Sequence, residues 1–182
     1  MDKFTRKTSF EQWFSPISST KLAELVEIHQ LNTYTKKLHM ASFLKLLLFA
    51  QLNETESLRA ISETLFSDDL QKVTDLESIS FSQLGRRLNQ VPTAVFQEVF
   101  LDLVAQIHEK SQYEQRRKTT TPLKIIDSST LPLNLNNHKW AEFRKTKSGI
   151  KLHLRLVFVE KGCSYPDQAV LTNAKEHDRG QL

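Results

Sequence analysis

The sequence predicts an α+β protein, with a helical first part and β-strands after it. Apolar side chains recur at helical spacing over about the first 112 residues. A polar, basic segment follows and ends at Pro122. Beyond it, apolar and polar residues alternate, which is the period of a strand. We therefore expect a helical unit over residues 1–112, a basic linker over 113–122 and a strand-forming unit over 123–182.

The first helices are indicated by apolar spacing and by capping residues. The apolar residues Leu22, Leu25, Val26 and Ile28 predict a short helix that begins at Ser19 or Thr20. Residues 38–52 are apolar on nearly every side, which predicts a buried helix. Asn53, with Glu56 three residues later, predicts a capping box that starts the next helix.

Two further helices follow. Ser80 with Gln83 repeats the capping-box pattern and predicts a helix that continues through Leu88. Pro92 suits the first position of the next helix, because a backbone N–H at that position has no hydrogen-bond partner within the helix. Behind it, seven apolar residues keep helical spacing for about five turns: Val95, Phe96, Val99, Phe100, Leu103, Val104 and Ile107.

The second unit is expected to hold three strands, over residues 123–131, 150–159 and 169–172. In the second strand one face is apolar and the other is basic. The apolar face has Ile150, Leu152, Leu154 and Leu156, and the basic face has Lys151, His153 and Arg155.

Composition limits the class of protein. Hydrophobic residues make up 39% of the chain, which is enough for a core. Cys163 is the single cysteine, which excludes an internal disulfide and a cysteine-based zinc site and fits a reducing cytoplasm. The first ten residues are mostly polar or charged, and polar residues interrupt the apolar stretch within 38–52. We therefore expect no signal peptide, no membrane span and a cytoplasmic location.

Positive charge is concentrated in one segment. Residues 110–155 hold eleven Lys or Arg and three Asp or Glu, a net charge of +8, whereas residues 1–109 have a net charge of −3. Such an excess is typical of a protein that binds a polyanion. Trp140 and Phe143 lie among the charges and could pack on sugars or bases, which favours nucleic acid. The alternative is a solvated basic loop.

The residues expected to contact DNA fall in three places. They are Arg86 and Arg87 on the capped helix, Lys139, Trp140, Arg144, Lys145 and Lys147 in the basic loop, and Lys151, His153 and Arg155 on one strand face. The capped helix could be the second element of a helix-turn-helix, or its arginines could lie on a solvated face. The basic strand face could line a phosphate backbone, or be an exposed sheet face or edge on which lysine deters aggregation.

Asp127 is the candidate metal ligand. It lies in the first predicted strand, and a carboxylate inside an apolar strand is costly unless it is paired or liganded. Two-metal phosphoryl transfer uses carboxylates held on rigid elements, and Mg²⁺ prefers such oxygen ligands. The alternative is that Asp127 ends the strand and caps a turn with Ser128 and Ser129.

Several motifs together carry a family resemblance. They are Ile126-Asp127-Ser128-Ser129-Thr130, the segment 138–153, Tyr165-Pro166-Asp167, the segment 174–178 and the opening Phe10-Glu11-Gln12-Trp13-Phe14. With these motifs the chain resembles bacterial insertion-sequence transposases of the DDE type. Members of that family have a ribonuclease-H-like catalytic domain that contains a Tyr-Arg-Glu-Lys block.

The resemblance implies a function in DNA transposition and also implies that the catalytic set of this chain is incomplete. Asp127 matches the first catalytic Asp, which would bind Mg²⁺ or Mn²⁺ in a two-metal site, and the DNA partners would be transposon ends and target in the bacterial nucleoid. The second Asp and the Tyr-Arg-Glu-Lys block are absent, so we expect an inactive N-terminal portion with only the first three strands of a truncated ribonuclease-H-like domain. A non-catalytic DNA-binding protein or inhibitor, and a helical interaction protein, stay open. The open sheet edge favours poor solubility or a homodimer.

Overall fold

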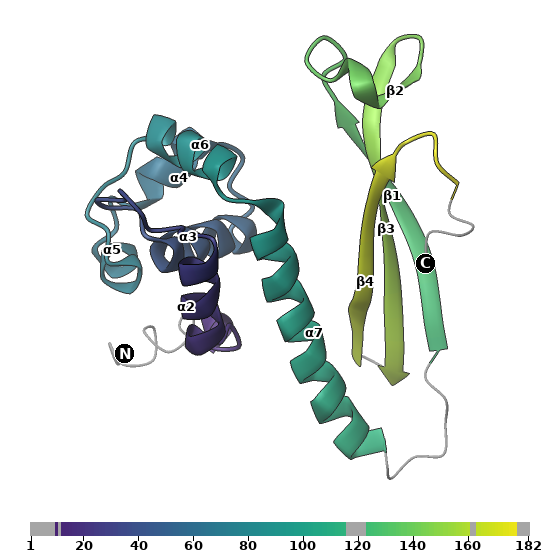
Figure 1. Ribbon diagram of the computed structural model, residues 1–182, viewed down its shortest axis with the longest axis horizontal. Helices are drawn as coiled ribbons and strands as arrows, with labels where there is room; N and C mark the ends of the chain where they lie inside the picture. Colours follow the sequence, from purple (N-terminus) through teal and green to yellow (C-terminus); the bar gives the residue numbers. More distant parts are fainter. Residues whose placement is uncertain (1–9, 11, 116–122, 161–162, 178–182) are drawn as a thin grey trace. The chain divides into compact units, whose positions relative to one another are not determined.

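The chain divides into two compact units, Met1–Leu103 and Val104–Leu182, and each is described by itself. The computed structural model describes residues 10, 12–115, 123–160 and 163–177 (Figure 1). Helices build the first unit, and an antiparallel sheet builds most of the second. The expectation of an α+β protein with helices first and strands afterwards is confirmed.

The division between the units falls within helix α7, Thr93–Gln115. Residues 113–115, which we assigned to the basic linker, therefore still belong to a helix. Residues 116–122 of that linker lie outside the described part of the chain. The proposed domain boundary at 113–122 stays a prediction.

Helices α2 and α3 match the sequence pattern closely. Helix α2 spans Ser19–Ile28, and the Ser18 hydroxyl caps it by accepting a hydrogen bond from the Lys21 N–H at 3.2 Å. Helix α3 spans Met40–Leu52 and is largely buried, as its apolar composition predicts.

The predicted capping box at Asn53 and Glu56 is wrong. Asn53 ends α3, and its side-chain amide donates to the Phe49 carbonyl at 2.8 Å. The next helix, α4, spans Leu58–Thr64, and its N-cap is Ser57. An Asn side chain can hydrogen-bond to backbone groups at either the start or the end of a helix. Here the Asn53 amide bonds to a carbonyl of the preceding helix.

The remaining helices pack in the same unit. Helix α5 spans Asp68–Thr74 and was not predicted. Helix α6 spans Phe81–Gln90 and begins with the predicted capping box of Ser80 and Gln83. Helix α7 begins at Thr93, directly after Pro92. The first unit encloses one apolar core, whose fully covered residues include Leu25, Met40, Phe43, Leu46, Leu65, Leu84 and Val95.

The sheet of the second unit is antiparallel, with β3 in its centre. Strand β1 (Leu123–Leu133) pairs with one edge of β3 (Lys147–Glu160), and β4 (Cys163–Asn173) and the short β2 (Glu142–Arg144) also pair with β3. The three predicted strands are confirmed, and each is longer than predicted. Pro166 is tolerated inside β4 because β4 lies at an edge and the ladder bulges there.

One face of this sheet is apolar and open. Residues opposite each other across antiparallel strands share a face, so Asp127, opposite Leu154, lies on the same face as Ala169, which also opposes Leu154. That face exposes apolar side chains of all three long strands, namely Leu123, Ile125, Leu131, Phe158 and Leu171. We refer to it as the apolar sheet face.

The opposite face is buried in part. His153, Val157 and Tyr165 are buried there. The ring of Tyr165 meets the ring of His108 from α7 edge-on, with centroids 5.4 Å apart. Both rings belong to the second unit.

Candidate nucleic-acid interface

The cationic loop of the sequence folds into a small, well-defined projection of the sheet. It consists of the 3₁₀ turn η1 (Lys139–Ala141), strand β2, the turn at Lys145 and Thr146, and the start of β3. We call residues 139–147 the basic hairpin (Figure 1).

Four cations of the basic hairpin are exposed to solvent: Lys139, Arg144, Lys145 and Lys147. Arg144 and Lys147 are partners in the β2–β3 ladder, so they share one side of it. The Arg144 guanidinium lies 5.8 Å from the centroid of the Phe143 ring. Among the residues that the structure describes, none of these four cations forms an ion pair. With Glu142 as its one carboxylate, the basic hairpin therefore keeps a net charge of +3.

The backbone of the basic hairpin is anchored at several points. The Ser148 hydroxyl donates to the His138 carbonyl at 2.6 Å, and the Asn173 amide donates to the Trp140 carbonyl at 3.2 Å. Ala141 is fully buried beneath the turn. These contacts hold η1 against β3 and β4, so Lys139 and Trp140 project from a fixed base.

Gly149 allows this close packing. A Cβ placed at Gly149 would lie 2.9 Å from the Leu131 carbonyl oxygen and 3.2 Å from a carbon of the Phe143 ring. Any side chain would push β3 away from the β1 backbone and from the Phe143 ring. Glycine is thus required because the Leu131 carbonyl and the Phe143 ring approach this position closely, and not because of an unusual φ angle.

Trp140 projects from the anchored turn and is 68% exposed. Its ring meets the His138 ring edge-on, with centroids 6.5 Å apart. The sequence placed this indole among cations, and the structure keeps it accessible on the same hairpin.

The basic face predicted for β3 is not a continuous cationic wall. His153 is fully buried, and its Nε2 lies 2.8 Å from the Thr172 hydroxyl. Arg155 donates two hydrogen bonds to Asp167, from Nε at 2.8 Å and from Nη2 at 3.0 Å. Lys151 donates to the Glu176 carbonyl at 2.8 Å. Burial removes His153 from the surface that DNA could reach, and Arg155 is committed to a carboxylate.

Asp167, the carboxylate that binds Arg155, has a buried side chain. The Asp167 side chain is only 5% exposed and lies where the β3–β4 register shifts, between the partners of Arg155 and Leu156. The hydrogen bonds from Arg155 lower the pKa of Asp167, with a smaller contribution from Lys124 at 4.0 Å. Pro166 in the strand sequence was the available signal for this bulge.

The two arginines of α6 differ. Arg86 is exposed, whereas Arg87 is 7% exposed and donates to the Asn32 side-chain oxygen at 3.3 Å. The same oxygen accepts the Met40 N–H at 2.9 Å, so Arg87 ties α6 to the start of α3. Burial lowers the pKa of Arg87. The expectation that Arg87 contacts DNA is corrected, because its guanidinium faces the inside of the helical unit.

Asp127 lies on β1 as predicted, but its surroundings differ from the expected ones. It is exposed on the apolar sheet face, so water solvates it and no burial cost demands a ligand. Its neighbours Ser128 and Ser129 continue the strand, which rules out the alternative of a turn cap. Within the described residues no three His, Cys, Asp or Glu side chains are placed to hold a metal ion.

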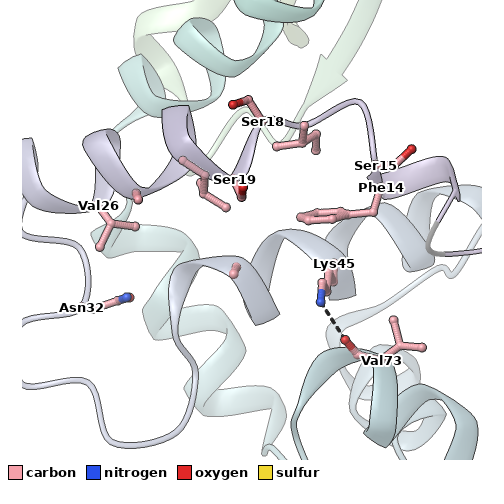
Figure 2. A pocket seen from close by; sticks show the side chains of 12 residues that line it. Phe14, Ser15, Ser18, Ser19, Val26, Asn32, Lys45 and Val73 are labelled. Carbon is pink, nitrogen blue, oxygen red and sulfur yellow. Dashed lines mark hydrogen bonds between the residues drawn. The ribbon is translucent and has the colours of Figure 1, made fainter.

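A hollow in the helical unit has a volume of about 810 Å³ (Figure 2). Lys45 lies on its wall, donates to the Val73 carbonyl at 2.9 Å and stands 5.4 Å from the centroid of the Phe14 ring. The described lining contains no Asp, Glu, His or Cys. The hollow therefore offers no acid–base or metal-binding set. No described helix is both long and apolar enough for a membrane crossing.

Two comparisons relate the chain to known proteins. Residues 5–72 match a family described as "Domain of unknown function (DUF4372)". Over 112 residues the chain is 27% identical to a Geobacillus stearothermophilus protein described as "Probable transposase for insertion sequence element IS5377". That match covers 60% of this chain but only 28% of the relative's length. No solved structure matches the chain significantly. The two matches support a transposase-related protein.

Proposed function

We propose that this chain is a transposase-related DNA-binding protein whose basic hairpin contacts the phosphate backbone. The observation that carries the proposal is the exposed cation set Lys139, Arg144, Lys145 and Lys147 on the basic hairpin, whose η1 turn is anchored to β3 and β4. Neutralising phosphates releases condensed counterions, and this release drives sequence-independent DNA binding. Arg86 on α6 remains a second proposed contact, from the helical unit.

We further propose that β1, β3 and β4 correspond to the first three strands of a ribonuclease-H-like domain. An antiparallel set with the second long strand in its centre supports this. Asp127 would then supply one carboxylate to a Mg²⁺ or Mn²⁺ site in a longer relative that cleaves and joins DNA. Among the described residues, no group of three His, Cys, Asp or Glu side chains could hold a metal ion, so we assign no metal-dependent step to this chain.

Fluorescence anisotropy with a labelled duplex tests the binding proposal. The variant K139Q/K145Q/K147Q removes three lysine charges from the basic hairpin, and K36Q/K37Q/K72Q removes three exposed lysine charges from the helical unit. The hairpin variant is expected to bind at least about tenfold more weakly at low salt, whereas the matched control changes little. Equal losses in both variants, or no duplex binding by the unaltered chain, contradict the proposal.

Asp127 provides a separate test. D127A should leave duplex affinity unchanged, since the carboxylate lies outside the basic hairpin. The unaltered chain with Mg²⁺ or Mn²⁺ should not cut DNA. Cleavage that D127A abolishes would show that this chain builds a complete active site after all.

A further inference from the structure

The basic hairpin carries an aromatic surface that phosphate binding alone does not require. Trp140 is 68% exposed, while the peptide that carries it is held by Asn173 and lies beside the fully buried Ala141. An indole on a fixed base loses little conformational freedom when it stacks on a flat ligand. Trp140 directly follows Lys139, so an aromatic surface for stacking lies beside positive charge that attracts the backbone of a nucleic acid.

We infer that Trp140 stacks on an unpaired base, so that the basic hairpin prefers single-stranded or frayed DNA to closed duplex. Inside a duplex both faces of each base are covered by neighbouring bases, and an indole finds a base face only at an unpaired or terminal position. Base–aromatic stacking beside a cationic groove is the general way in which proteins hold single strands. The inference rests on the proposed DNA binding and names the form of DNA.

The geometry limits how Trp140 can be used. The rings of His138 and Trp140 form a T-shaped pair with centroids 6.5 Å apart, so at least one face of the indole lies outside that ring pair. Arg144 and Lys147 are ladder partners on β2 and β3 and extend the positive charge beyond the turn. A strand whose base stacks on Trp140 can therefore place its phosphates against the same hairpin.

The chain supplies a matched control for the indole. Trp13 is 65% exposed, nearly the same as Trp140. It belongs to the helical unit, and no Lys or Arg occurs between residues 8 and 20. The two tryptophans thus differ in charge surroundings and not in accessibility.

The test measures anisotropy of a labelled single strand and of a long blunt duplex with G·C pairs at both ends. W140A should weaken single-strand binding by about 5- to 150-fold and duplex binding by less than about twofold. W140F should recover part of the loss, and W13A should change neither. In a W13F background, single-strand binding should quench the emission of Trp140.

The outcomes separate the two proposals. If the unaltered chain binds no DNA, the proposed function fails and this inference fails with it. If duplex binding and its loss in K139Q/K145Q/K147Q are observed but W140A leaves single-strand affinity unchanged, only the stacking inference is overturned. Equal losses on both substrates in W140A, or no quenching, also overturn it. Unchanged circular dichroism of W140A verifies that the fold is retained.

Discussion

Replacing Asp167 by alanine should destabilise the sheet unit far more than removing a nearby surface charge. Asp167 is 5% exposed and accepts two hydrogen bonds from Arg155, at 2.8 and 3.0 Å. It lies at the register shift of β4, so it also holds that strand against β3. The neighbouring Lys124 contact is longer, at 4.0 Å, and its side chain is 54% exposed.

The magnitude follows from these contacts. Hydrogen bonds to a charged group contribute about 1.5–3 kcal/mol each. The Arg155 side chain is 26% exposed and regains water when its partner is lost. We therefore expect D167A to lower the free energy of unfolding by about 2–3 kcal/mol. K124Q removes an exposed pair and should cost below about 1 kcal/mol.

Urea unfolding of the full chain in a W13F background measures the effect, because Trp140 then reports on the sheet unit. D167A should shift the Trp140 transition, whereas K124Q should shift it little. A double-mutant cycle with R155Q should give a coupling above about 1 kcal/mol between Arg155 and Asp167. If D167A and K124Q agree within about 0.5 kcal/mol, the reasoning about this ion pair is wrong.

Three other predictions follow from the sheet unit. The native pKa of Asp167 is lowered from 3.8. The unfolded chain therefore binds more protons between the two values, and stability should fall as pH drops through this window, less so in D167N. In urea unfolding, G149A should lower the free energy of unfolding by about 1–3 kcal/mol, because the added Cβ would lie 2.9 Å from a backbone carbonyl. G85A in α6 should be neutral or slightly stabilising, because the added Cβ would lie 3.4 Å from a side-chain carbon. I125K/L171K on the apolar sheet face should reduce self-association in sedimentation velocity, and I28K/F66K on the helical unit should not; unchanged sedimentation of I125K/L171K would exclude this face as the contact.

Local signals predicted the helical unit well. Ser80 and Gln83 interact across three residues of one turn, so their capping box could be read directly from sequence. The capping box predicted at Asn53 was wrong because asparagine suits both ends of a helix. Which end it occupies depends on the course of the chain around it. Helix α5 is short and stabilised by its neighbours, which sequence periodicity does not show.

The site depended on contacts between distant residues. Strand alternation placed Lys151, His153 and Arg155 on one face correctly, but it could not show which residues of that face are buried. His153 is therefore buried where an exposed contact was expected. Arg87 bonds to Asn32, which lies 55 residues away in sequence, and no spacing rule reports such a pair. The basic hairpin was predictable because its charges are neighbours in sequence.

The salt dependence of duplex binding tests most directly whether the basic hairpin meets DNA. Each phosphate contact adds about 0.9 to the slope of log affinity against log salt concentration. K139Q/K145Q/K147Q should therefore lower the magnitude of the slope by up to about 2.7, while K36Q/K37Q/K72Q leaves it near that of the unaltered chain. Equal slopes in all three proteins would contradict the assignment of the hairpin as the DNA contact.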